Sequence, residues 1–392
     1  MSYYILPKNI NTIFFNPIIS TEECKPYISY SFLNYYLEIK REITKLIECD
    51  NELSVIDFDD VIRIINPYEF IFSKVPGSKY SVSKLKPNTN MFYDLYEIFY
   101  NLNFFDKFNN KNIKSLHVSQ NYNDSIECFE MFRENYDDTI INFTDIDIDT
   151  DIDTDIDTNI DTNIDNNIDA NIDNNIDNNI DTNIDGETNK FNYIFYECNT
   201  SSQNDYFISL VKIMIIILKK LKTDGNVIIK AKDLLHKPVV DCIYFLTSIF
   251  DKVHIIKPNS NHITSLDRYI VCNSFKYDKK NSSVLRLNEK NLTILIKTLY
   301  SKNIIDIIGK DINYYFKNKI DDLNMVIGLQ QIEALDQVIS IFKNKNKNEK
   351  IESIKKSNIQ KSVLWCEKYK IPCNKFTEKT NIFLPIINET LF

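Results

Sequence analysis

The chain has 392 residues, of which 43% are hydrophobic and 12% aromatic, so it is long enough to bury a substantial core. Its net charge of −9 comes from one tract, because residues 145–185 hold 14 aspartates and no lysine or arginine. Without that tract the chain is mildly basic, at +5, which permits an anionic partner such as RNA.

The cysteines and histidines exclude two common kinds of site. Eight cysteines are scattered without a CxxC pair, and four histidines show no HxxxH or HExxH spacing. We therefore expect free thiols in a reducing compartment and no metal site. MSYYILPKNI does not resemble a signal peptide, and the apolar stretch 207–218 is too short to cross a bilayer. A cytoplasmic protein without a membrane partner is expected.

The N-terminal region is predicted to be mostly helical. Residues 1–20 carry two prolines among aromatic residues and are expected to lie as an arm on the surface. Thr21 is an expected helix start, and further helices are predicted over 28–47, 55–65 and 89–102.

Between these helices, a Gly/Pro/Ser loop over 73–87 carries four lysines and Tyr80. The simplest interpretation is a solvated loop. The alternative is that its lysines contact RNA phosphates while the tyrosine stacks on a base. The four candidate RNA-binding residues are Lys74, Lys79, Lys84 and Lys86.

A strand over 115–119 and a helix over 125–132 begin the α/β pattern, joined by QNYND. A nucleotide-type ligand would usually meet a glycine-rich turn here, but this turn has no glycine. The chain has five glycines in all, so it contains neither GxGxxG nor a P-loop. A second strand is predicted over 139–143.

The tract from Thr144 to Asp185 repeats isoleucine every four residues among Asp, Asn and Thr. This period makes no stable apolar stripe on a helix, and a strand would carry aspartate along one face. A disordered insertion is expected, with calcium binding by the aspartates as the alternative.

After the tract, strands and helices alternate, which indicates a mostly parallel sheet. Chemistry in such sheets sits at the carboxyl ends of strands, where Lys230 follows one strand and Asp267 precedes another. Strands are predicted over 193–196, 227–229, 253–256 and 269–272, and helices over 206–221 and 237–250. The C-terminal region is predicted to contain helices over 292–300, 304–316, 323–342 and 354–369, a linker over 343–350, and an apolar end over 380–392 that docks on the core.

The motifs GNVIIK, FDKVHIIKPNSN and SLDRYIVC occur in this order between Gly225 and Phe275, with a weaker match over 89–132. In these motifs the chain resembles the FtsJ family of S-adenosylmethionine-dependent RNA ribose 2′-O-methyltransferases. It is most similar to divergent members carried by large DNA viruses, and the segment WCEKYKIP adds to this likeness. The resemblance implies a Rossmann-like fold, S-adenosylmethionine as cofactor, an RNA substrate that is plausibly the mRNA cap, and viral transcription or capping proteins as partners.

The family uses a tetrad of lysine, aspartate, lysine and glutamate. By resemblance its second lysine falls on Lys230, its aspartate on Glu197 and its glutamate on Asp267, while Asp94 stands where the first lysine is expected. The simpler interpretations are a surface lysine, helix or turn caps, and a solvent-facing Asp94. The resemblance places the cofactor near the QNYND turn and the following strand, at Ser119, Asn121, Asn123, Asp124 and Asp145.

The expected organisation is an α/β Rossmann-like methyltransferase domain with helical extensions. It comprises an N-terminal helical region (1–88), the methyltransferase domain (89–276, with the insertion at 144–188) and a C-terminal helical region (277–392). Two functions stay open: a cap ribose methyltransferase, or a catalytically inactive FtsJ-like protein that binds RNA or a partner subunit. An unrelated structural α/β protein is the third interpretation.

Overall fold

The computed structural model describes residues 2–48, 58–120, 122–144, 190–198, 200–276, 282–299, 302–344 and 348–374. The expectations for the acidic tract, for the apolar C-terminal end, and for Asn121 and Asp145 lie outside these residues.

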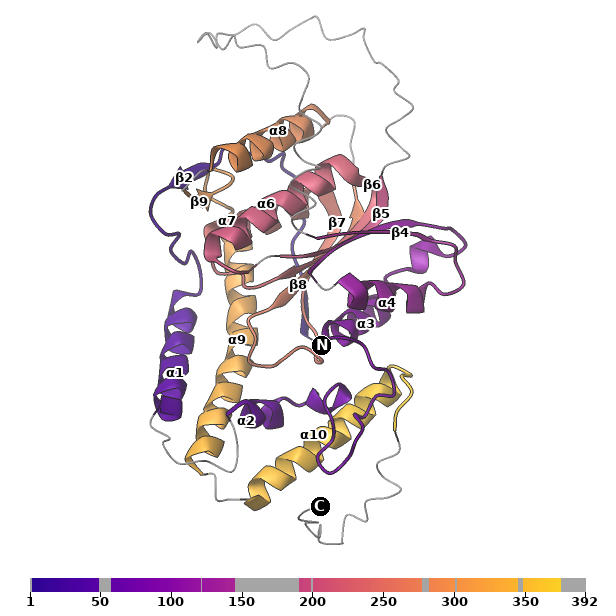
Figure 1. The fold of residues 1–392 in the computed structure, drawn as a ribbon. Coiled ribbons are helices and arrows are strands. Elements are labelled where there is room, and N and C mark those ends of the chain that lie inside the picture. Colours follow the sequence, from indigo (N-terminus) through magenta and orange to yellow (C-terminus); the bar gives the residue numbers. More distant parts are fainter. Residues whose placement is uncertain are drawn as a thin grey trace, which may run out of the picture.

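A seven-stranded mixed sheet forms the centre of the fold, in the order β1-β7-β8-β6-β5-β3-β4 (Figure 1). Parallel pairing joins β4 to β3, β3 to β5 and β5 to β6, whereas β8 runs antiparallel to both β6 and β7. The expected α/β architecture with a Rossmann-like strand order is therefore present, but the sheet is mixed and the mostly parallel sheet that was expected is wrong. The strands are β1 (Ser2–Ile5), β3 (Lys114–Val118), β4 (Thr139–Phe143), β5 (Phe191–Glu197), β6 (Leu221–Ala231), β7 (Phe250–Lys257) and β8 (Arg268–Phe275).

Helices cover both faces of this sheet (Figure 1). One face packs against α6 (Gln203–Lys220), α7 (Lys237–Ile249) and α8 (Ser282–Thr298), and the other against α3 (Met91–Leu102) and α4 (Tyr122–Phe132). Strand β5 alternates accordingly, with Ile194 and Tyr196 in the first core and Tyr193 and Phe195 in the second. A strand buried on both faces reads as a continuous apolar run, which is why YIFY was recognisable as a strand.

Aromatic rings fill the core beneath α3 and α4. The ring of Tyr193 stacks on that of Phe129 with a centroid distance of 5.7 Å. His117 lies beside both rings, fully buried, and its Nδ1 meets Ser125 Oγ at 2.9 Å. Its Nε2 has no hydrogen-bond partner in the described part of the chain. Burial lowers the pKa of His117 to about 3, so this imidazole is neutral.

A helical layer adjoins the sheet and forms a third core. It contains α1 (Tyr30–Glu48), α2 (Phe58–Ile65), α9 (Tyr314–Lys343) and α10 (Asn348–Lys368), and the short 3₁₀ turn η1 (Glu69–Ile71) packs against α10. A second 3₁₀ turn, η2 (Asp106–Phe108), follows α3, and its Phe108 lies in the core beneath α3 and α4. By length and composition alone α9 would also suit a membrane span. Here, however, it packs along α1, and a Cβ atom on Gly328 would lie 2.4 Å from the ring of Phe32.

The N-terminal arm differs from the expectation. Its first residues form β1, which extends the sheet antiparallel to β7, and β2 (Ile18–Ser20) pairs with β9 (Asn303–Asp306). The helix start expected at Thr21 is wrong, because residues 21–29 are not helical and α1 begins at Tyr30. The segment instead follows the sheet edge, where Pro26 forms a β-bridge with His236.

The helix expected over 304–316 is also wrong. This stretch contains β9 and a turn, and α9 starts only at Tyr314. The cause is a tertiary contact, because Asp241 Oδ2 on α7 accepts the backbone N–H groups of Ile307 (2.9 Å) and Ile308 (3.3 Å). Gly309 then takes a left-handed φ of +71°, which a glycine adopts without strain.

Candidate functional site

Lys230 and Glu197 meet at the carboxyl ends of β6 and β5. The two residues are paired in the register of these parallel strands, so their side chains leave the sheet side by side. Lys230 Nζ lies 2.7 Å from Glu197 Oε1. Their side chains are 22% and 24% exposed, so the ion pair is reachable from solvent. The sheet register therefore brings together two of the four residues that the family resemblance selected.

Further contacts hold this ion pair in place. The Ser119 hydroxyl, just beyond β3, donates to Glu197 Oε2. Burial lowers the pKa of Lys230, but Glu197, followed by Asp267 and Asp94, outweighs burial and holds that pKa above its usual value. The side chain is therefore an ammonium at neutral pH, a group that donates hydrogen bonds to negative charge and does not accept a proton.

Asp94 lies on α3 with 2% of its surface exposed, so the solvent-facing interpretation is wrong. Its Oδ1 accepts from the Ser260 hydroxyl at 2.6 Å, and its Oδ2 accepts from Asn261 Nδ2 at 2.7 Å and the Tyr269 hydroxyl at 3.0 Å. Burial raises the pKa of Asp94 to about 6, although these hydrogen bonds and Lys230 oppose the shift. A carboxyl group, bound by three donors, occupies the position where the family lysine was expected.

Lys257, at the end of β7, fixes the loop that leads to Asp267. Its ammonium donates to Asn261 Oδ1 and to the backbone carbonyls of Ser265 (2.8 Å) and Asp267 (3.3 Å). Burial, with nearby Arg268, lowers the pKa of Lys257 well below its usual value. Lys257 is 7% exposed and has three acceptors in this loop, so it holds the loop in place beside the site. Asp267 itself is half-buried, and its charge acts on Lys230.

The same loop is held from the other side by Glu97. This buried carboxylate lies one helical turn after Asp94, and its Oε2 accepts the backbone N–H groups of Asn259 (3.0 Å) and Ser260 (3.2 Å). Trp365 Nε1 on α10 donates to the same oxygen at 3.1 Å. Sequence reasoning missed Glu97 and Lys257. The polar run PNSN, directly after Lys257 and an apolar strand, was the sequence signal that could have indicated a polar site here.

The proposed cofactor residues divide into three groups. Asn121 and Asp145 lie outside the described residues. Asn123 is exposed on the first turn of α4, where backbone N–H groups are also available. Asp124 is fully buried and accepts from the backbone N–H of Asn88 (3.0 Å) and the Thr89 hydroxyl, so it fixes the chain leading into α3.

Ser119 is likewise turned toward Glu197 rather than outward. The carboxyl ends of β3, β4 and β5 nevertheless converge at this turn, because the three strands are parallel and adjacent. Among the described residues of this turn, Asn123 is the one cofactor candidate whose side chain is exposed. Ser119 and Asp124 serve as supports of the turn.

The loop of residues 73–87, here called the lysine loop, lies against the C-terminal end of the described chain. Lys84 N donates to Pro372 O at 2.8 Å, and Ser83 forms a β-bridge with Cys373. Lys74, Lys79, Lys84 and Lys86 are all exposed, as is Tyr80 at 57%. The lysine loop leads to Asn90, whose Nδ2 donates to Ser260 O at 2.6 Å. Because Ser260 also donates to Asp94, the lysine loop adjoins the site.

In the described part of the chain, no group of three His, Cys, Asp or Glu side chains is placed to hold a metal ion. The seven described cysteines are free thiols, as expected.

Comparison with known proteins finds a likeness to one methyltransferase family. Residues 134–275 match the sequence model of the FtsJ-like methyltransferases. The chain is also 28% identical over 132 residues to the "Cap-specific mRNA (nucleoside-2′-O-)-methyltransferase 1" of Drosophila melanogaster, a match that covers 32% of this chain and 17% of the relative. The family match includes Glu197, Lys230 and Asp267, but it begins at residue 134 and so does not include Asp94 or Ser119.

Proposed function

We propose that the chain is an S-adenosylmethionine-dependent RNA ribose 2′-O-methyltransferase that acts on the mRNA cap. The observation that carries this proposal is the ion pair of Lys230 with Glu197, 2.7 Å apart at the carboxyl ends of neighbouring parallel strands within the FtsJ-like region. The distant likeness to a cap-specific methyltransferase supports the choice of substrate.

Lys230 has the properties that transfer to a hydroxyl requires. In such a transfer the bound cofactor would supply the methyl group: its carbon would bond to the ribose 2′-oxygen as the carbon–sulfur bond breaks with the electron pair left on sulfur, and the hydroxyl proton would leave to water. Negative charge develops on the 2′-oxygen, and the Lys230 ammonium stabilises it by a hydrogen bond. Glu197 orients that ammonium and keeps it charged, while Asp267 adds to the same field.

The cofactor supplies an electrophilic methyl group when bound. The chain around the β3–α4 turn, including Asn123 and the proposed Asn121 and Asp145, would hold it beside Glu197. The lysine loop would guide RNA toward the site by phosphate contacts. We extend the proposal to a cytoplasmic setting and to viral transcription or capping proteins as partners.

One preparation tests this function. Calorimetry measures the binding of S-adenosylmethionine to the full chain, and a methyl-transfer assay follows labelled methyl groups into a short capped RNA and into the same RNA carrying 2′-O-methyl groups. We expect binding and transfer to the unblocked RNA alone. No binding of the cofactor at millimolar concentration would contradict the proposal.

A second function is favoured by a specific observation: Asp94 and its three hydrogen-bond donors fill the position of the expected family lysine. A site that has lost this cation suits a non-catalytic subunit that binds RNA or a partner protein. RNA binding without methyl transfer in the same assays would favour this function over the first.

A further inference from the structure

Two tyrosines at the start of α9 are unusually open to solvent. Tyr314 is 77% exposed and Tyr315 is 60% exposed. Together with Tyr27 and the lysines around them they form a surface, here called the aromatic–lysine patch, of Lys25, Tyr27, Tyr314, Tyr315, Lys317 and Lys319. We propose that this patch binds a stretch of single-stranded RNA that continues beyond the site at Lys230, an inference that rests on the proposed function.

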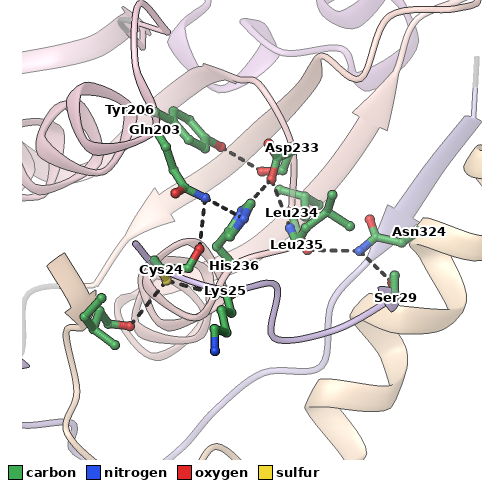
Figure 2. Close-up of polar contacts among 11 residues, drawn as sticks. Cys24, Lys25, Ser29, Gln203, Tyr206, Asp233, Leu234, Leu235, His236 and Asn324 are labelled. Carbon is green, nitrogen blue, oxygen red and sulfur yellow. Dashed lines mark hydrogen bonds and ion pairs between the residues drawn. The ribbon is translucent and has the colours of Figure 1, made fainter. Parts of the chain in front are cut away.

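The patch is attached to the same sheet edge as the site. Gln203 and Lys237 begin the helices that follow β5 and β6. Figure 2 shows the Gln203 side chain between His236 and the N-terminal arm, where its Nε2 donates to Cys24 O at 3.2 Å. Tyr27 N donates to Leu235 O at 2.8 Å. The segment leading to Tyr27 therefore lies against the connections that follow β5 and β6, the strands that carry Glu197 and Lys230.

The beginning of α9 is fixed against this segment. Lys317 Nζ lies 4.0 Å from the centre of the Tyr27 ring, and Lys237 Nζ donates to Lys310 O at 3.1 Å. Further along α9, Asn324 Nδ2 donates to Leu234 O at 2.9 Å (Figure 2). From Lys230 to Leu235 the chain can extend at most about 18 Å. Leu235, which accepts from Tyr27 N in the patch, is therefore no farther than this from the site.

The chemistry of the patch suits a nucleic acid strand. Exposed tyrosine rings provide flat surfaces on which bases stack, and this binding tolerates any sequence. Residues 310–319 hold three lysines against one aspartate. In the described part of the chain, no carboxylate lies within ion-pair distance of these three lysines (Lys310, Lys317 and Lys319) or of Lys25. These ammonium groups are available to phosphates, and a purely apolar protein partner would leave them unused.

The test measures the affinity of the full chain for fluorescent single-stranded RNA of about 4 and about 16 nucleotides, the range of site sizes for such proteins. Tyr314→Ala combined with Tyr315→Ala should weaken binding of the longer strand by about 10-fold or more, since each stacked base contributes about 1–3 kcal/mol. The shorter strand should bind equally well to both proteins. Tyr35→Ala on α1, another exposed tyrosine, is the matched control and should change neither affinity.

A second pair of variants tests whether the lysine charges of the patch contact RNA phosphates. Lys317→Gln with Lys319→Gln should reduce the slope of log affinity against log salt by about 1.4, or about 0.7 for each lost phosphate contact. Unchanged affinity and slope in both pairs would overturn the inference and assign the patch to a protein partner. If the wild-type chain methylates short capped RNA while the patch variants bind long RNA normally, this inference alone fails. If the wild-type chain binds neither RNA, the proposed function fails with it.

Discussion

Replacing Asp94 by asparagine should make the protein more stable at neutral pH. The pKa of Asp94 is about 6 against an ordinary value of 3.8, because burial outweighs the hydrogen bonds and Lys230. The folded protein therefore holds this proton more tightly than the unfolded chain, and the free energy of unfolding falls as pH rises from about 4 to about 6. Each pKa unit corresponds to about 1.4 kcal/mol, so ionising Asp94 costs the folded state about 3 kcal/mol above pH 6.

Asparagine preserves the shape and most contacts of Asp94 while removing its charge. Its oxygen can accept from Asn261 Nδ2 and the Tyr269 hydroxyl, as Oδ2 does now, and its NH₂ group then faces Ser260 Oγ, a hydroxyl that also accepts. The stability gained by Asp94→Asn over wild type should therefore grow by more than about 2 kcal/mol between pH 4 and pH 7.

The measurement is urea unfolding of both proteins at a series of pH values, with the difference in unfolding free energy plotted against pH. Asp106→Asn changes the same charge at an exposed position and serves as the control. A difference between Asp94→Asn and wild type that does not vary with pH would refute the reasoning. It would mean that Asp94 is ionised as easily in the folded protein as in the unfolded chain.

Three further predictions concern the site and the core. Lys230→Ala should lower the rate of methyl transfer at least about 10²-fold because the developing alkoxide loses its cation. Lys252 is an exposed lysine on β7, and Lys252→Ala is the control that should leave this rate unchanged. Equal rates for Lys230→Ala and wild type would remove Lys230 from the mechanism. His117→Phe should lower the midpoint pH of acid unfolding followed by circular dichroism, since the pKa of about 3 makes wild type lose stability as pH falls below about 6.5; an unchanged midpoint would contradict this. Gly328→Ala should lower the unfolding free energy, because the clash with Phe32 costs about 1–3 kcal/mol against about 1 kcal/mol gained in helix propensity. Gln330→Ala, exposed on the same helix, is its control, and a stabilised Gly328→Ala protein would show that α1 moves aside freely.

The central strands could be predicted because their signal is local. Short β-branched and aromatic runs such as TIINF and YIFY favour a strand on their own, and even the edge strand β4 matches its predicted bounds, Thr139–Phe143. Lys230 was found for the same reason, since a polar residue after such a run marks the carboxyl end of a strand.

The environment of Asp94 could not be predicted, because its three partners come from residues 260–269, far along the chain. Charge and spacing around Asp94 contain no information about those donors. β1 and β9 were missed for a related reason. Each is short, and each becomes a strand only through a partner that the sequence pattern does not identify.

The pairing of β1 with β7 sets the order in which the protein can be assembled during synthesis. Residues 2–5 leave the ribosome about 250 residues before their partner residues 254–257. Strand β1 therefore has no partner until β7 has been made, and a ribosome-bound chain ending before Phe250 has no place for it. Closing so long a loop is slow, which makes this edge the step at which a nascent chain is most open to misassembly.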